Sequence, residues 1–209
     1  MRLAACMMTL LLLGACAFTE ETIPVDYKAP SNMELAVGAA DVTVSVEAKD
    51  GRVSNKDRVS SKKNGYGIET APIKAGNDVV VLTQEAVEHE LESLGFKVGP
   101  GGLIAKVELQ TFYNDFKNGF FSGDAVAEVA FNLTVTRSDG SYVYSRSYKG
   151  VGMNKNIQMA SGSNAKVALE EALTNAMQQF IEDTNMHKAL VAAVKAPTEA
   201  SAKTSAAGS

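Results

Sequence analysis

The sequence contains few of the residues that build metal centres and acid–base sites. Its two histidines, His89 and His187, fall on different predicted helices, and its two cysteines, Cys6 and Cys16, both lie near the start. The chain after Cys16 has no thiol, so it can form no disulfide and offers no cysteine ligand to a metal. His89 stands among acidic residues, as is typical of a solvated helix face. The inventory predicts no cofactor, no metal site and no enzyme.

The chain also lacks an excess of positive charge and a long apolar run. Its 20 Lys and Arg face 24 Asp and Glu, a net charge of −4. A mildly acidic chain with scattered lysines argues against a sequence-independent grip on nucleic acid. The apolar stretch over residues 3–13 is too short to span a bilayer but has the length of a signal-peptide core.

Leu13-Gly14-Ala15-Cys16 ends this apolar stretch and resembles the lipobox of bacterial lipoproteins. The resemblance implies a signal peptide over residues 1–15, cleavage before Cys16 and lipidation of its sulfur, palmitate included. In Gram-negative lipoproteins an aspartate after the cysteine retains the protein in the inner membrane. Ala17 stands there instead, which implies a lipid anchor in the outer membrane, facing the periplasm. The alternative is an ordinary secretory cleavage site at Ala15-Cys16-Ala17, which would release a chain without lipid.

Composition divides the mature chain into three parts. Residues 16–32 contain two prolines, three acids and few large apolar side chains, so we expect a lipidated flexible tether. Residues 33–195 carry the periodic patterns of one folded domain. Residues 196–209 contain little beyond Ala, Ser, Thr and Lys and predict a disordered tail.

The first half of the domain predicts a strand, a loop and a helix. Valines alternate with polar residues over residues 41–48, the pattern of a half-buried strand. Residues 52–64 are rich in Lys, Ser and Asn and predict an exposed loop, with a weaker extended piece over residues 66–73. A helix is predicted over residues 79–94, capped by Asn77 or Asp78 and ended by Gly95.

The second half predicts three strands and a helix. The strands are expected over residues 103–112, 125–137 and 142–151, with a hairpin turn at Asp139-Gly140. A helix opens within residues 160–163, buries Leu169, Leu173 and Phe180, and continues through residue 194 with a break near Asn185. The fold class is therefore α+β, with a four-stranded, mostly antiparallel sheet in β-α-β-β-β-α order and two helices on one face.

This layout, with the lipobox, resembles the YajG-like family of bacterial outer-membrane lipoproteins. The features that carry the resemblance are the strand over residues 42–46 ending at Asp50-Gly51-Arg52, the helix end Leu91-x-x-Leu94-Gly95-Phe96, the alternating strand after it, and the closing helix over residues 168–181. Lipoproteins that assist ABC-type lipid transporters share much the same plan. Neither family implies a set of catalytic residues.

An aromatic cluster is the main candidate for a binding site. Five of the fourteen aromatic residues fall within ten positions: Phe112, Tyr113, Phe116, Phe120 and Phe121. Loops seldom carry so much apolar surface without covering it or using it. One interpretation is that the rings cap the open end of the sheet. The other is that Phe116, Phe120 and Phe121 dock an envelope protein partner.

Ser163 and Lys166 form the Ser-x-x-Lys spacing of penicillin-binding enzymes at a helix start. The companion motifs are missing, so a capping serine and a solvated lysine are the simpler interpretation. The leading functional hypothesis is a non-catalytic outer-membrane lipoprotein that binds an envelope protein. The alternatives are an accessory lipoprotein of an ABC-type lipid transport system and, last, a Ser/Lys cell-wall hydrolase.

Overall fold

The computed structural model describes residues 18–30, 34–119 and 122–195. The predicted signal peptide, Cys16, Phe120, Phe121 and the predicted tail lie outside these residues. The described elements follow the order β1 (Glu21–Ile23), η2 (Ala39–Asp41), β2 (Thr43–Asp50), β3 (Ser60–Lys63), β4 (Glu69–Ala75), α2 (Val79–Ser93), β5 (Lys97–Val98), β6 (Leu103–Asn118), β7 (Gly123–Thr136), β8 (Tyr142–Ile157), α3 (Gly162–Ile181) and α4 (Thr184–Lys195).

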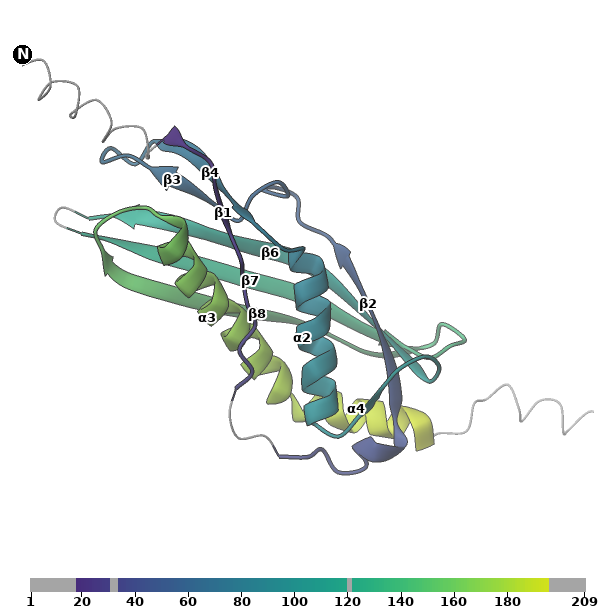
Figure 1. The fold of residues 1–209 in the computed structure, drawn as a ribbon. Helices are drawn as coiled ribbons and strands as arrows, with labels where there is room; N and C mark the ends of the chain where they lie inside the picture. Colours follow the sequence, from purple (N-terminus) through teal and green to yellow (C-terminus); the bar gives the residue numbers. More distant parts are fainter. Residues whose placement is uncertain (1–17, 31–33, 120–121, 196–209) are drawn as a thin grey trace, which may run out of the picture.

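The described strands form two sheets (Figure 1). A five-stranded sheet has the order β5-β2-β6-β7-β8, and a three-stranded sheet has the order β1-β4-β3. The predicted α+β class is confirmed, but the single four-stranded, mostly antiparallel sheet is wrong. The larger sheet is mixed: β2 runs parallel to β5 and β6, whereas β6, β7 and β8 are antiparallel. The path from β2 to β6 includes β3, β4 and α2, and a long crossover of this kind permits parallel pairing.

One face of the larger sheet carries the core. Along β7, the side chains of Ala125, Ala127, Val129, Phe131, Leu133 and Val135 are all buried, as their period-two spacing predicts. Helices α2 and α3 both cover this face, α2 over β2 and α3 over β7 and β8 (Figure 1). The predicted helices on one face are therefore confirmed, and the predicted break near Asn185 separates α3 from α4.

Helix α2 begins and ends at the residues that its sequence predicts. Asp78 is the N-cap, and its carboxylate accepts hydrogen bonds from the backbone N–H groups of Val80 and Val81 at 2.8 and 3.4 Å. Gly95 follows the helix with φ of 93°, a left-handed conformation that suits glycine. Asn77 has another role: its amide donates to the Val25 carbonyl and accepts from the Val25 N–H, at 2.9 and 3.1 Å.

Residues 21–28 of the segment expected as a flexible tether are packed on the domain, so that prediction is wrong for this part, whereas residues 18–20 are exposed. Strand β1 pairs in parallel with β4, and the side chains of Ile23 and Val25 are 5% and 1% exposed. Lys166 on α3 donates to the Pro24 carbonyl and the Asp26 carboxylate, at 2.7 and 2.6 Å. Composition missed this packing because few apolar side chains make it, namely Ile23, Val25 and the partly buried Tyr27.

The predicted exposed loop over residues 52–64 contains strand β3, and the predicted aromatic loop is the end of strand β6. Backbone pairing continues to Asn118, and the N–H of Asn114 donates to the carbonyl of Val59 at 2.8 Å. The register shifts between Leu109 and Thr111, so the buried positions change from odd to even numbers along β6. An irregularity of this kind does not show in a single sequence.

Candidate binding site

Three residues of the predicted aromatic cluster are described by the structure, namely Phe112, Tyr113 and Phe116, and all three lie on strand β6. Phe112 and Phe116 are 1% and 3% exposed, and Tyr113 is half-buried on the other side of β6. Phe112 therefore continues the strand inward, as expected. Phe116 is part of the core and presents no ring to a partner, which corrects its assignment as a docking residue. Phe120 and Phe121 lie outside the described residues.

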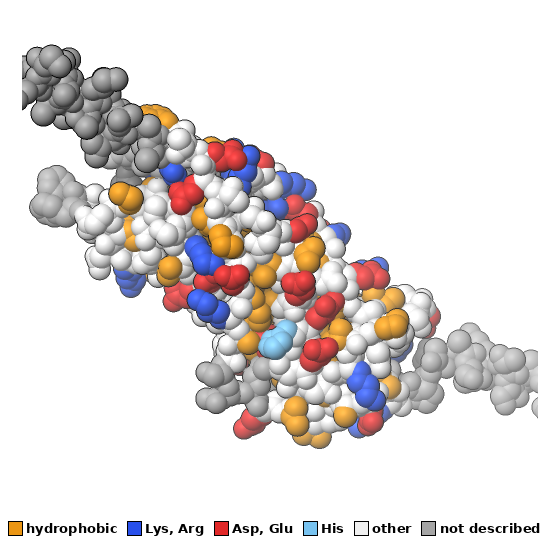
Figure 2. Space-filling model, in the orientation of Figure 1, with side chains coloured by type: hydrophobic (Ala, Val, Ile, Leu, Met, Phe, Trp, Pro, Cys, Tyr) orange, Lys and Arg blue, Asp and Glu red, His pale blue; other side chains and the backbone are white. Residues whose placement is uncertain are grey.

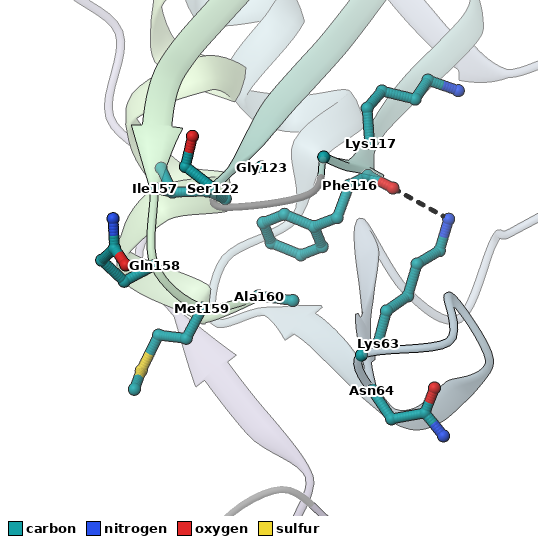
Figure 3. A pocket seen from close by; sticks show the side chains of 12 residues that line it. Lys63, Asn64, Phe116, Lys117, Ser122, Gly123, Ile157, Gln158, Met159 and Ala160 are labelled. Carbon is teal, nitrogen blue, oxygen red and sulfur yellow. Dashed lines mark hydrogen bonds between the residues drawn. The ribbon is translucent and has the colours of Figure 1, made fainter.

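A small polar pocket lies beside Phe116 (Figure 3). It has a volume of about 250 Å³ and is lined by Lys63, Asn64, the ends of β6 and β7, and residues 157–160. The ammonium of Lys63 donates to the carbonyl of Phe116 at 3.1 Å and also pairs with Asp115. Lys117, which also lines the pocket, pairs with the same Asp115, so both lysines among the described lining residues already have carboxylate partners.

A larger, mainly apolar groove of about 750 Å³ lies at the other end of the sheet. We call it the α4 groove, and it is lined by residues 34–37, Leu94, the end of α3, and one face of α4 that includes His187, Val191 and Lys195. The N–H of Ala36 donates to the carbonyl of Leu94 at 2.9 Å, which fixes the path of residues 34–37 along α2. Leu35 and Val37 are 74% and 96% exposed.

The charges of the α4 groove stand around an apolar centre. Glu34, Glu182, Lys188 and Lys195 contribute both signs to its lining. Burial lowers the pKa of His187, against the attraction of Asp183, so the imidazole is neutral at neutral pH. Its Nε2 atom is buried without a hydrogen-bond partner, and the ring packs against Phe96. An apolar centre with a mixed polar rim is the usual composition of a protein-binding surface.

Sequence reasoning missed the α4 groove because its lining comes from four separate stretches of the chain. The available signal was a pair of alternating apolar residues, Leu35 and Val37, just after the predicted tether. Val191 and Val194 on the amphipathic α4 gave a second signal; Val191 packs against the core and Val194 is 48% exposed. Neither signal indicates by itself that the two stretches meet.

Ser163 and Lys166 do not form a reacting pair. The hydroxyl of Ser163 bonds to Ser161, which is the N-cap of α3, so Ser163 lies inside the first turn and is not the predicted capping residue. Lys166 pairs with Asp26 and Glu170 at 2.6 and 2.5 Å. Burial alone would lower the pKa of Lys166, but these carboxylates raise it overall. A lysine held protonated cannot act as a general base.

The two histidines lie in different contacts, and among the described residues neither belongs to a group of three ligands that could hold a metal ion. His89 contacts Tyr27 edge to face, whereas His187 packs on Phe96. Among residues 18–30, 34–119 and 122–195 no cluster of three His, Cys, Asp or Glu residues could hold a metal ion.

Figure 2 shows acidic and basic side chains interspersed over the face that carries α2 and α3.

The chain folds into a small α+β domain with an apolar groove, and the comparisons with known proteins place it in a lipoprotein family. A family described as an uncharacterized lipoprotein matches residues 30–191, so the chain belongs to that family. Among curated proteins it is similar to the uncharacterized lipoprotein YajG of Escherichia coli strain K12, with 23% identity over 185 residues that cover 87% of this chain and 92% of YajG. The YajG-like assignment is thereby confirmed.

One solved structure shares the fold. The crystal structure of protein XCC0632 from Xanthomonas campestris matches with a TM-score of 0.54 and 15% identity, over 81% of this chain and 96% of that one. A minor lipoprotein from Acinetobacter baumannii matches more loosely, with a TM-score of 0.45 and 9% identity over 70% and 92% of the two chains. The descriptions of the family and of YajG name no catalytic function. In the described part of this chain, no helix is both long and apolar enough to cross a membrane.

Proposed function

We propose that this lipoprotein is a non-catalytic adaptor, held by lipid on Cys16 at the periplasmic face of the outer membrane, that binds an envelope protein in the α4 groove. The lipobox Leu13-Gly14-Ala15-Cys16 and the absence of Asp at position 17 support the anchor and its membrane. Membership of a lipoprotein family also supports a lipid anchor.

The position of the α4 groove is the observation that carries the binding role. The chain enters the domain at β1, beside the β3–β4 turn, whereas α4 and η2 lie at the opposite end of the sheet (Figure 1). Strand β6 has 16 residues, and at about 3.3 Å per residue its ends are on the order of 50 Å apart. A domain anchored at Cys16 would therefore present the groove to the periplasm, well away from its own membrane.

The chemistry of the groove favours a protein segment as its occupant. Leu35 and Val37 are exposed on a segment that a backbone hydrogen bond holds in place, so they offer apolar contacts without further ordering. The mixed charges of Glu34, Glu182, Lys188 and Lys195 can pair with either sign at the rim. An apolar groove of this size on a helical surface suits an amphipathic helix or an extended peptide.

The test is photo-crosslinking in cells, with a photoreactive amino acid at position 37 and, as the matched control, at position 53. Val53 is 98% exposed and lies outside the groove lining. We expect a discrete protein adduct from position 37 that disappears in the Leu35→Glu background, and no such adduct from position 53. Equal labelling from the two positions, or an adduct unaffected by Leu35→Glu, would overturn the assignment of the groove.

A second function, the accessory lipoprotein of a lipid transporter, is favoured by the volume and apolar lining of the same groove. About 750 Å³ is enough to hold an acyl chain. In that case the purified protein should carry phospholipid in native mass spectrometry, and the Leu35→Glu substitution should reduce the bound fraction. An adaptor for a protein partner should carry none.

The anchor itself is tested by Cys16→Ser. We expect the variant to remain as an uncleaved precursor or to leave the membrane fraction, whereas the wild type should cofractionate with outer membranes. The intact mass of the wild type should correspond to acyl chains on a chain that begins at Cys16. An unmodified chain that begins after the cleavage site would contradict the lipid anchor.

A further inference from the structure

We propose that the end of the sheet nearest Cys16 rests directly on the bilayer, with Phe18, Tyr66, Ile68 and Met159 inserted among the lipid headgroups. We call this surface the proximal end and define it as residues 18–20, 64–68 and 158–161. The inference rests on the proposed lipid anchor. It differs from the sequence-based expectation, in which a free tether holds the domain away from the membrane.

Three stretches of the chain meet at the proximal end. Because β1 runs parallel to β4, the residues before Glu21 lie alongside the start of β4, next to the turn that joins β3 to β4. Strand β3 in turn lies against the last part of β6, through Asn114 and Phe116. Residues 158–160 and the turn residues Asn64 and Gly65 line the same pocket, which places them side by side.

The proximal end exposes four large apolar side chains, one from each of two stretches and two from the third. Phe18 is 70% exposed, Tyr66 92%, Ile68 62% and Met159 68%. Figure 2 shows hydrophobic side chains at this end, next to the grey N-terminal atoms. Single exposed apolar residues need no explanation. Four such residues from three stretches that meet at one end indicate a surface that another molecule covers when the protein functions.

The turn that carries Tyr66 and Ile68 is held in one conformation. The side-chain oxygen of Asn64 accepts hydrogen bonds from the N–H groups of both residues, each at 3.0 Å, and Gly67 adopts a φ of 79°. An aromatic ring and a branched aliphatic side chain are therefore presented to solvent on a fixed turn. The turn therefore loses little conformational freedom when these side chains insert into a lipid layer.

The charges of the proximal end point to apolar insertion and not to attraction by anionic lipid. Lys63 and Lys117 both pair with Asp115, and Lys74 pairs with Glu20 at 2.8 Å. Lys62 pairs with Glu21 at 3.3 Å. Three carboxylates offset three of these four positive charges, so the net charge of the group is small. Tyr is enriched at the headgroup level of membranes, and Phe is common on apolar faces that insert there.

The chain between the lipid and the domain is short, which favours the membrane as the partner that covers the proximal end. Only two peptide units separate Cys16 from Phe18, so at about 3.5 Å per residue their Cα atoms lie within about 7 Å whatever path the chain takes. Glu21, the first residue of β1, lies within about 18 Å by the same limit. Lipid on Cys16 therefore holds the proximal end at the bilayer surface, where even weak insertion is favoured by the high local concentration.

The experiment uses the absence of tryptophan from the chain, which makes one introduced indole the sole reporter of its kind. Tyr66→Trp places it at the proximal end. Tyr142→Trp is the matched control, because Tyr142 is 66% exposed at the far end of β8. Each lipidated variant is reconstituted into phosphatidylethanolamine and phosphatidylglycerol vesicles, with and without brominated acyl chains, and the vesicles are floated before measurement.

We expect the indole at position 66 to shift to shorter emission wavelength in vesicles and to be quenched by brominated lipid several-fold more strongly than the indole at position 142. Flotation with no difference between the two indoles would overturn the inference and leave the anchor standing. Failure to float would instead contradict the anchor. A blue shift at position 66 in the vesicle-free Cys16→Ser protein would show that a second copy covers this surface, and would also overturn the inference.

Discussion

Two buried carboxyl groups, whose pKa values shift in opposite directions, illustrate how single residues affect the stability of this domain. Glu90 on α2 is fully buried and accepts from the hydroxyl of Tyr27, while its other oxygen has no partner. Burial raises the pKa of Glu90 despite the Tyr27 hydrogen bond and the proximity of His89. Asp183 is equally enclosed, but hydrogen bonds from Tyr144 and Tyr148 bring the pKa of its carboxyl below the usual value, although burial alone would raise it.

Glu90→Gln should make the protein more stable at neutral pH. A raised folded-state pKa means that the native protein binds more protons than the unfolded chain, so the stability contribution of Glu90 is present at low pH and lost as pH rises through its folded pKa. The gain should exceed the roughly 0.5 kcal/mol typical of surface changes and should shrink as pH falls. Urea unfolding between acid and neutral pH measures it.

The matched control for this change is Glu85→Gln, on the exposed face of the same helix. It should alter neither the stability at neutral pH nor its pH dependence. If Glu90→Gln and Glu85→Gln behave alike, Glu90 is not buried as the structure shows.

Asp183→Asn should have the opposite dependence on pH. The carboxylate accepts from Tyr144, Tyr148 and Arg146 at 2.6, 2.8 and 3.0 Å, and also from two backbone N–H groups that begin α4. An amide has only one acceptor oxygen, so we expect a loss on the order of 1 to 3 kcal/mol at neutral pH. A lowered folded-state pKa gives stability that is lost as pH falls, so the deficit of the variant should shrink in acid.

Asp57→Asn is a suitable control for that measurement, since the Asp57 side chain is 65% exposed in a surface pair with Arg58. Its effect should stay within about 0.5 kcal/mol at every pH. A deficit at position 183 that grows in acid would contradict the role assigned to its carboxylate.

At the scale of elements, the close packing of α3 on β8 depends on small residues on both sides. Ala165, Ala168, Ala172 and Ala176 on α3 are fully buried. A Cβ atom at Gly150 would lie 1.9 Å from the carbonyl oxygen of Ala172, and one at Gly152 would lie 2.1 Å from that of Ala168. The helix backbone therefore rests directly on the strand, and β8 cannot carry a methyl group at either glycine unless α3 moves away.

Gly150→Ala or Gly152→Ala should destabilise the domain by about 1 to 3 kcal/mol through overpacking. Gly65→Ala is the control, because a Cβ at Gly65 meets nothing within 4 Å. Thermal or urea unfolding of the three variants tests the expectation. Equal midpoints would show that α3 can move away from β8 at no cost.

At the scale of the whole molecule, the N-terminal segment belongs to the domain that it was expected only to tether. Strand β1 extends the smaller sheet, and residues 24–28 run along α3, where Asp26 and Lys28 pair with Lys166 and Glu170. The domain boundary therefore lies closer to Cys16 than composition indicates. The proximal end and the α4 groove are then separated by the full length of the sheet.

Removing residues 16–33 should destabilise the domain strongly, whereas removing residues 197–209 should not. The first truncation removes Ile23 and Val25, which are buried in the core. Burial of a side chain of this size contributes about 1.5 to 3 kcal/mol to the free energy of unfolding. The second removes a polar stretch for which we expect a change below about 0.5 kcal/mol. Both are measured by unfolding of protein lacking the lipid. A neutral N-terminal truncation would contradict the packing of β1.

The sequence by itself determined the local elements of this protein. Period-two valines predicted β2, the alternation of β7 predicted its buried face, and Asp78 and Gly95 bounded α2, because each signal is complete within a few neighbouring residues. The lipobox is likewise local, and the family resemblance that the comparisons confirmed is a series of such local features along the chain.

Only the tertiary structure decided which of these elements meet. The parallel pairing of β2 with β6, the recruitment of β1, the register shift near Gln110 and the assembly of the α4 groove all join residues far apart in the chain. Short polar strands such as β3 are stabilised by neighbours and not by their own composition. The sequence therefore predicts a loop for the aromatic cluster, although Phe112 and Phe116 become core once β6 pairs with β7 to its end.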